Sequence, residues 1–133
     1  MVADYLIVKI SNIPNAGRGL FTTKGIKRWY KVCQFLGEII APEEHEKRGL
    51  FEDERSSYMI DLGNGLFMDS FPVECLAKYA NDAIDSKYKN NCGIRVESKL
   101  NRAFIVSLKY IKPGEEILVD YGVSYWENYK QWK

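Results

Sequence analysis

Short apolar runs separated by turn-forming residues dominate the hydrophobic pattern of the chain. Runs rich in β-branched and aromatic residues predict strands, and they fall at residues 5–10, 20–24, 57–62, 66–69, 93–98, 102–108 and 117–119. Gly63-Asn64-Gly65 separates two of these runs, and Asn-Gly is typical of a tight hairpin turn. We therefore expect a mainly β protein built from short hairpins.

Helices are expected at three places between and after the strands. Residues 42–48 begin with a proline and two glutamates, which favour the first turn of a helix, and residues 73–79 have amphipathic spacing. Four aromatic residues follow the last apolar run at spacings that fit a helix: Tyr125, Trp126, Tyr129 and Trp132. We expect a C-terminal helix that closes the core or forms an aromatic flap.

Composition limits the classes of protein and partner. The 133 residues suit one domain, 1–133. The net charge of +1 argues against nucleic acid as the main ligand. No apolar run approaches the roughly 20 residues that span a bilayer, and the N-terminus lacks the pattern of a signal peptide. These features predict an intracellular protein without a membrane segment.

Cysteine and histidine positions argue against a metal. Cys33, Cys75 and Cys92 are odd in number and widely spaced, which is typical of reduced thiols rather than of disulfides or a zinc site. The single histidine, His45, lies in a charged run without a second ligand nearby. We expect no metal site and no catalytic role for His45.

A candidate site lies near the end of the chain. Pro113-Gly114 predicts a turn, Glu115 and Glu116 are expected to be exposed, and residues 117–119 form a strand that Asp120-Tyr121-Gly122 ends. A phenol at a strand end, next to a glycine and to aromatic residues, is well placed to line a narrow apolar slot. The alternative is a buried strand that only completes the core.

Residues 114–122, Gly-Glu-Glu-Ile-Leu-Val-Asp-Tyr-Gly, resemble the last signature of the SET-domain protein lysine methyltransferases. The continuation to Trp126 is similar to small free-standing members, including a viral one. Three further blocks follow the family order at 17–19, 26–40 and 78–92. The sequence departs from the family at positions where other residues are usual: Trp29 (for Gly), Phe35 (for Tyr), Asp82 (for His), Ala83 (for Ser) and Asn90 (for Pro).

The resemblance implies a SET (β-clip) fold, in which short sheets and a knot-like crossing surround the active site. It also implies methyl transfer from S-adenosylmethionine to a lysine ε-amine, with Tyr121 orienting the methyl group and stabilising charge. Only about one lysine in a thousand is neutral near pH 7. An apolar channel beside a sulfonium lowers the lysine pKa by desolvation and repulsion.

The family positions assign roles to particular residues. Tyr121 and Tyr58 are the catalytic candidates. Cofactor contacts are implied for Ala16, Gly17, Arg18, Gly19, Tyr58, Asn81, Asp82, Tyr121 and Trp126, with Asn81 at the amino-acid end. The substrate channel is expected to involve Tyr58, Val119, Tyr121 and Tyr125, although Tyr125 and Trp126 fit simple packing almost as well. In the family the position of Val119 is often Phe or Tyr, and a Tyr there holds a water beside the amine. Val119 is small and cannot bind this water, which predicts di- or trimethylation unless Tyr58 or Tyr125 supplies the hydroxyl.

Activity, partners and location follow as expectations. Both Tyr121 and Asn81 are present, which favours an active enzyme over a catalytically weak module that binds a peptide or cofactor. Histone tails are the family's commonest substrates, and a histone substrate implies the nucleus; otherwise we expect the cytoplasm. No cysteine follows Cys92, so a zinc-bound post-SET lid is not expected, and no pre-SET segment is expected either. Trp29 is a candidate homodimer or partner contact, or a tryptophan that covers the core.

Overall fold

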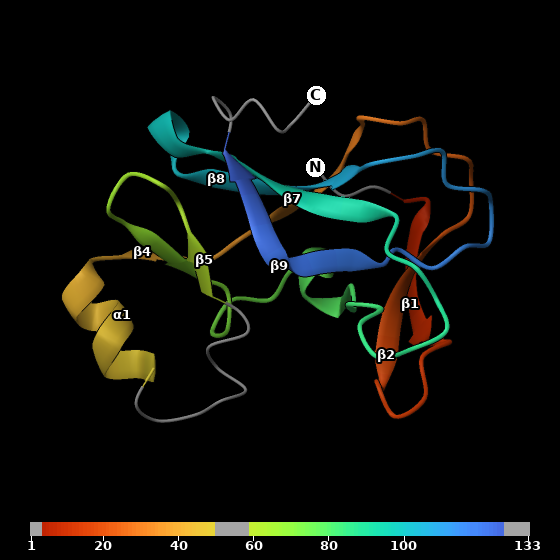
Figure 1. Cartoon of the computed structure of the whole chain (residues 1–133), viewed down its shortest axis with the longest axis horizontal. Coiled ribbons are helices and arrows are strands. Elements are labelled where there is room, and N and C mark those ends of the chain that lie inside the picture. The colour runs from red at the N-terminus through yellow and green to blue at the C-terminus, as the bar shows by residue number, and fades with distance from the viewer. Residues whose placement is uncertain (1–3, 50–58, 127–133) are drawn as a thin grey trace.

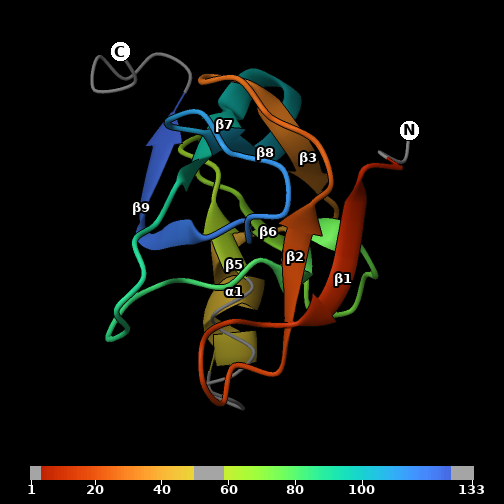
Figure 2. The same cartoon turned by 90° about the vertical axis from the view of Figure 1, so that its right-hand side faces the viewer.

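Three small sheets, one α-helix and two short 3₁₀ helices make up the described part of the chain (Figures 1 and 2). The computed structural model describes residues 4–49 and 59–126, with the backbone alone for Gly49 and residues 122–126. The mainly β fold class is confirmed. Within these ranges no helix is both long and apolar enough to cross a membrane.

An antiparallel hairpin at the N-terminus forms the first sheet. It consists of β1 (Leu6–Ile10) and β2 (Arg18–Thr22), with Ile10 opposite Arg18. The Ser11 N–H donates to the Gly17 carbonyl at 2.9 Å and closes the connecting loop. Both predicted strands are confirmed, although β2 begins two residues before the predicted 20–24 run.

The largest sheet has four strands in the order β3-β8-β7-β9. Their bounds are β3 (Lys31–Phe35), β7 (Cys92–Glu97), β8 (Arg102–Ser107) and β9 (Val119–Trp126). β7 and β8 form the predicted hairpin across a 3₁₀ helix, Ser98–Leu100, whereas β9 runs parallel to β7. Figure 1 shows β9 beside β7, as this pairing requires.

The third sheet has the order β4-β6-β5, with β4 (Glu38–Ile40), β5 (Met59–Asp61) and β6 (Phe67–Asp69). Gly63 and Gly65 adopt positive φ angles of 76° and 90°, which confirms the hairpin turn. The predicted helix at 42–48 is α1 (Pro42–Gly49), which lies beside β4 in Figure 1. His45 on this helix stacks on Phe67, with ring centroids 3.9 Å apart.

The core lies between the sheets and includes side chains from all three. Its fully buried members include Leu20 of β2, Leu62 after β5, Ile94 of β7 and Ile105 of β8. The three cysteines are free thiols, and Cys75 and Cys92 are buried. Burial, with a smaller effect of Cys75, raises the pKa of Cys33 to about 12. Cys33 therefore stays protonated at neutral pH and is a poor nucleophile.

A segment near the C-terminus passes between parts of the chain that are distant in sequence. On one side the Ile117 N–H donates to the Leu20 carbonyl at 2.7 Å. On the other side the Leu118 carbonyl accepts from the N–H groups of Asn91 and Cys92, both at 2.9 Å. The Asn91 side chain also bonds this segment, because its amide donates to the Glu116 carbonyl and accepts from the Leu118 N–H. These bonds form the knot-like crossing that the sequence predicts.

The final strand and one helix differ from the sequence prediction. The C-terminal helix is not confirmed, since β9 continues as a strand to Trp126 and residues 127–133 lie outside the described part. Backbone pairing of Arg95 with Tyr125 and of Val96 with Trp126 stabilises the extended form, which β-branched and aromatic residues favour. The predicted helix at 73–79 is a shorter 3₁₀ helix, η1 (Leu76–Tyr79).

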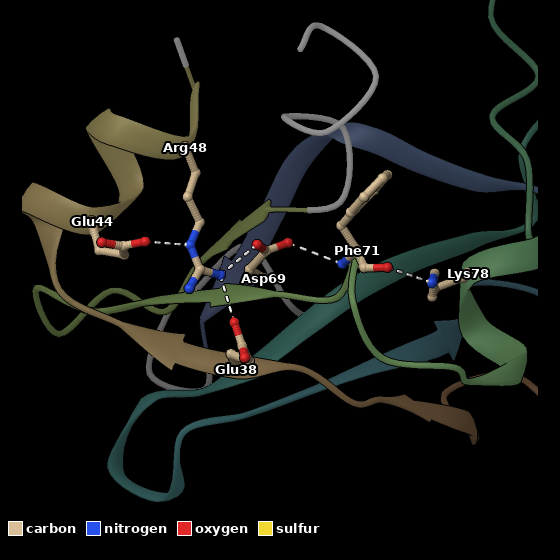
Figure 3. A network of polar contacts seen from close by, with 6 residues as sticks. All are labelled: Glu38, Glu44, Arg48, Asp69, Phe71 and Lys78. Carbon is tan, nitrogen blue, oxygen red and sulfur yellow. Dashed lines mark hydrogen bonds and ion pairs between the residues drawn. The ribbon is translucent and has the colours of Figure 1, made fainter. Parts of the chain in front are cut away.

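Arg48 connects α1 to the third sheet (Figure 3). Its guanidinium bonds Glu44 at 2.7 Å, Glu38 of β4 at 2.6 Å and Asp69 of β6 at 2.8 Å. These hydrogen bonds raise the pKa of Arg48 above its ordinary value. Asp69 is fully buried, so its ion pair with Arg48 is the least exposed to solvent of the three.

Replacing Arg48 with alanine is expected to lower the free energy of unfolding by about 2 kcal/mol, because it removes a cation from the buried Asp69 carboxylate. Glu44→Gln is the matched control, since it weakens a more exposed ion pair of the same guanidinium and is expected to cost less than about 1 kcal/mol. Urea denaturation of both variants measures the difference. Equal costs would contradict a dominant role for the Arg48–Asp69 pair.

Candidate active site

Tyr121 lies where β9 departs from regular pairing with β7. From Cys92 to Ile94, β7 advances by two residues, whereas β9 advances by five from Val119 to Ser124. The intervening residues of β9 therefore bulge out of the ladder, and bulges re-aim side chains near functional sites. The Tyr121 hydroxyl donates to the Ala80 carbonyl at 2.9 Å and lies 3.5 Å from the Ala77 carbonyl. These bonds fix the position of the phenol oxygen.

Asp82 accepts the backbone N–H that the bulge leaves without a strand partner. Its Oδ2 accepts from the Tyr121 N–H at 3.0 Å, and its Oδ1 accepts from the Ile84 N–H and the Asn90 side-chain amide, both at 3.0 Å. The Asn90 Oδ1 in turn accepts from the Ala83 N–H at 2.8 Å. Asp82 and Asn90 thus hold the loop of residues 82–90 against the backbone of Tyr121.

Asn81 links this loop to the start of β2. Its side-chain nitrogen donates to the Arg18 carbonyl at 2.9 Å, and its backbone carbonyl accepts from the Val119 N–H at 2.8 Å. Within the described part of the chain, no hydrogen bond is recorded for the Asn81 Oδ1 atom, and Asn81 is half-buried. This oxygen can therefore accept from a ligand ammonium group.

The two glycines at the start of β2 have different surroundings. Gly17 has a φ of 74°, and no atom lies within 4 Å of where its Cβ would be, so a ligand can approach its backbone. A Cβ on Gly19, in contrast, would lie 2.3 Å from Oε2 of Glu116. Gly19 thus makes room for Glu116, and its predicted cofactor contact stays a prediction.

Glu116 is a structural residue of the site that sequence reasoning missed. It was expected to be exposed, but only 4% of its surface is accessible. Its carboxylate accepts from the Ser11 hydroxyl at 2.6 Å and the Asn12 N–H at 2.9 Å, and it lies 3.5 Å from the Asn81 side-chain nitrogen. An isolated buried carboxylate is costly unless hydrogen bonds satisfy it. The glycine at position 19 was the available signal, since it makes room for this side chain.

An aromatic wall stands beside the phenol. Phe35, at the end of β3, is buried, and its ring meets the Tyr121 ring edge-on with centroids 6.3 Å apart. The segment 77–82 supplies carbonyl groups on another side of the hydroxyl. The arrangement combines a fixed phenol oxygen, polar backbone and an apolar ring, which suits the positioning of a small, partly positive reacting group.

Comparisons with known proteins place this geometry in a family. The family model described as the SET domain matches residues 17–122. The chain belongs to the SET-domain family. The match runs from the Gly17 loop to the residue after Tyr121, and so includes Asn81, Asp82, Glu116 and Tyr121.

Curated relatives of this SET domain are much longer proteins. It is 32% identical over 124 residues to the histone-lysine N-methyltransferase SUV39H2 of Mus musculus. This alignment covers 86% of this chain and 25% of that protein. It is 29% identical over 109 residues to the histone-lysine N-methyltransferase EZ1 of Zea mays, covering 80% of this chain and 11% of that protein. The SET domain described here thus spans a quarter or less of these two relatives.

Solved structures confirm the fold assignment. A Chaetomium thermophilum Polycomb Repressive Complex 2 chain bound to GSK126 aligns with a TM-score of 0.74 at 26% identity, over 98% of this chain and 17% of that chain. A ctPRC2 chain in an autoinhibited conformation bound to S-adenosylmethionine aligns with a TM-score of 0.73 at 25% identity, over 98% of this chain and 16% of that chain.

The SET domain connects four of the predicted site residues through backbone and side-chain bonds. Arg18, Asn81, Asp82 and Tyr121 form one connected set through the bonds given above. Val119 is fully buried among core residues, so its role as a channel wall stays a prediction. Tyr58 lies outside the described residues, as do the side chains of Tyr125 and Trp126, and Ala16 lies in the loop before Gly17.

Proposed function

We propose that this SET domain transfers a methyl group from S-adenosylmethionine to the ε-amine of a lysine in a protein, with a histone tail as the substrate. The observation that carries the proposal is the Tyr121 hydroxyl, which is fixed on the carbonyl of Ala80, the residue immediately before Asn81. The names of its relatives, which are histone-lysine N-methyltransferases, support the reaction and the substrate class. A histone substrate would place the protein in the nucleus.

The residues present fit S-adenosylmethionine. When bound, it would supply a methyl group on a positively charged sulfonium. The Asn81 Oδ1 is free to accept from its ammonium group, and the open backbone at Gly17 allows close approach. The Tyr121 hydroxyl directs its proton to the Ala80 carbonyl, so the oxygen lone pairs can face a partly positive methyl carbon.

The lysine must react as a neutral amine. Phe35 and Tyr121 provide an apolar wall that excludes water from the amine. Desolvation and the nearby sulfonium charge both lower the lysine pKa, so the amine loses its proton to solvent more readily. Fixing the amine in line with the methyl then lowers the entropic part of the barrier.

Cofactor binding and methyl transfer can be tested separately on the full chain. Calorimetry with S-adenosylmethionine measures binding, and radiolabelled methyl transfer to purified core histones measures the reaction. We expect both. If the protein binds S-adenosylmethionine but transfers no methyl group either to histones or to a mixture of other proteins, it is a binding module and not an active enzyme.

Asn81→Ala is expected to weaken S-adenosylmethionine binding at least about tenfold, because a ligand ammonium group loses its acceptor and the bond to the Arg18 carbonyl is lost. Asn64→Ala is the matched control. Asn64 also carries a hydrogen-bonded amide, but its partners are Ser98 and Asn101. Calorimetry compares the two variants, and undiminished affinity in Asn81→Ala would show that the block at 78–92 is wrongly aligned.

The number of methyl groups added is expected to be two or three. Val119 cannot hold a water molecule in the space where a further methyl group must fit. Mass spectrometry of a long reaction with excess cofactor measures the product, and accumulation of monomethyl-lysine alone would contradict the prediction. Val119→Tyr should shift the product toward one methyl, provided that denaturation shows the variant is folded, since Val119 is fully buried.

A further inference from the structure

Charge is distributed unevenly along the sequence. Residues 5–37 contain no aspartate or glutamate, although the whole chain has 18 acidic residues. The same stretch contains these cations: Lys9, Arg18, Lys24, Lys27, Arg28 and Lys31. The net charge of +1, which argues against nucleic acid binding, averages over this asymmetry. A local surface can therefore be strongly positive on a nearly neutral protein.

The fold adds further cations to this region. The segment between β2 and β3 runs antiparallel to residues 109–113, because Ile26 and Ile111 exchange two backbone hydrogen bonds of 2.9 Å. In Figures 1 and 2 these segments lie side by side, one orange and one blue. The pairing brings Tyr110 and Lys112 next to the earlier segment. We name the resulting face the basic–aromatic surface: Lys24, Lys27, Arg28, Trp29, Tyr30, Tyr110 and Lys112.

Three large aromatic side chains on this surface are exposed to solvent. Trp29 is 43% exposed, Tyr30 51% and Tyr110 55%. Trp29 is thus not a buried core residue. Exposed aromatic rings next to cations are unusual for a face that only contacts water.

The backbone at Trp29 is held in a strained conformation. Its φ is 67°, a left-handed value that costs a residue with a side chain about 1–2 kcal/mol. Ser107 holds the turn: its carbonyl accepts from the Trp29 N–H at 2.8 Å, and its hydroxyl oxygen accepts from the Tyr30 N–H at 2.9 Å. The fold therefore stabilises a costly turn that presents an indole to solvent. Such strain is a reason to look for function at this position.

A hollow in the surface lies between the aromatic and cationic groups. Its volume is about 250 Å³, and it is lined by Tyr5, Lys24, Gly25, Ile26, Lys27 and Tyr30. A Cβ on Gly25 would lie 2.2 Å from the Tyr110 hydroxyl oxygen, so Tyr110 closes over this glycine. Lys24 lies 4.2 Å above the Tyr5 ring, which keeps a cation at the wall of the hollow.

The cations of this segment remain available to an anionic partner. Among the described residues, no carboxylate forms an ion pair with Lys24, Lys27 or Arg28. Two acids lie near the surface: Asp4 precedes Tyr5, and Glu115 accepts from the Lys112 N–H. The four cations of the basic–aromatic surface outnumber these two acids, so the face is net positive.

We propose that the basic–aromatic surface binds single-stranded nucleic acid. The lysines and Arg28 would contact phosphates, and the exposed rings would stack on unpaired bases. An acidic peptide would satisfy the cations, but its anionic groups do not alternate with flat rings as the phosphates and bases of a single strand do. Bases in a duplex stack on one another and are not free to stack on Trp29 or Tyr110.

Fluorescence anisotropy of a labelled oligothymidylate with the full chain tests the proposal. We expect saturable binding that weakens as salt increases. The variant K24E/K27E/R28E should weaken binding at least about tenfold and lower the slope of log affinity against log salt by about 2, since each lost phosphate contact contributes about 0.7. K47E/K87E/K99E makes the same change in net charge at exposed sites elsewhere and should weaken binding much less.

Trp29→Asn separates stacking from charge. Asparagine tolerates the left-handed backbone, so the turn is kept while the indole is lost. Binding should weaken about fivefold or more with an unchanged salt slope, and a duplex of the same length should bind more weakly than the single strand.

Methylation of a free histone-tail peptide should be the same in K24E/K27E/R28E and the parent, which keeps this test independent of the proposed function.

Four results would overturn the proposal. The first is the absence of saturable binding at low salt, and the second is an equal loss of affinity in the two triple variants. The third is a duplex that binds as tightly as the single strand, together with full affinity in Trp29→Asn. The fourth is self-association of the protein through this surface. Analytical ultracentrifugation of the parent and of K24E/K27E/R28E detects the last of these.

Discussion

Tyr121→Phe is expected to lower the rate of methyl transfer at least about tenfold, which corresponds to about 1.4 kcal/mol of barrier. The hydroxyl is held by the Ala80 carbonyl at 2.9 Å, so its oxygen is fixed before the substrates bind. Phenylalanine keeps the ring and its edge contact with Phe35 but removes that oxygen. The loss should therefore fall on the chemical step rather than on cofactor affinity.

Single-turnover rates at saturating cofactor, together with calorimetry, measure the two effects of Tyr121→Phe. Tyr79→Phe is the control, because its hydroxyl bonds the exposed Glu74 side chain at 2.6 Å. The control should keep nearly the full rate. An unchanged rate in Tyr121→Phe, or an equal loss in Tyr79→Phe, would remove Tyr121 from its proposed role.

Glu116→Ala is expected to lower the free energy of unfolding by about 3 kcal/mol and to weaken cofactor binding. The substitution leaves the Ser11 hydroxyl and the Asn12 N–H without their acceptor, and charged hydrogen bonds contribute about 1.5–3 kcal/mol each. It also removes the carboxylate beside the Asn81 amide. Glu116→Gln keeps one acceptor oxygen and should recover part of the stability.

Gly19→Ala provides a sharper test of the same contact. The new Cβ would lie 2.3 Å from the Glu116 carboxylate, so this single substitution should also destabilise the fold. In the double variant G19A/E116A the clash with the carboxylate is absent, and the cost should be clearly less than the sum of the two single costs. Urea denaturation of the four proteins measures the coupling, and additive costs would contradict direct packing of Gly19 on Glu116.

The strands and the site motifs could be predicted because their signals are local. Apolar runs and turn residues such as Gly63-Asn64-Gly65 located the hairpins, and the blocks at 78–92 and 114–122 contain Asn81 and Tyr121, which the structure connects through Asp82. Glu116 could not be placed in this way. It lies beside Glu115, which is exposed, and only the distant Gly19, Ser11 and Asn12 make its burial favourable.

The structural effect of residues that depart from the family pattern could not be predicted either, because it depends on contacts that form only in the folded protein. Asp82 and Asn90 each replace a usual residue, yet they bond each other at 3.0 Å and hold the loop together as a pair. The bulge before Ser124 depends on the register with β7, and the strand form of Tyr125 and Trp126 depends on the same partner. Their aromatic spacing alone suggests a helix.

The crossing has a consequence for how the protein folds during synthesis. Residues 116–119 bond to Leu20, Asn81 and Asn91, which the ribosome produces much earlier. Until the last strand emerges, those backbone groups lack their partners, and the nascent chain exposes unpaired edges that chaperones bind and that promote aggregation. Contacts between such distant residues also slow folding. Arg18, Asn81 and Tyr121 therefore come together only after residues 116–121 have been synthesised.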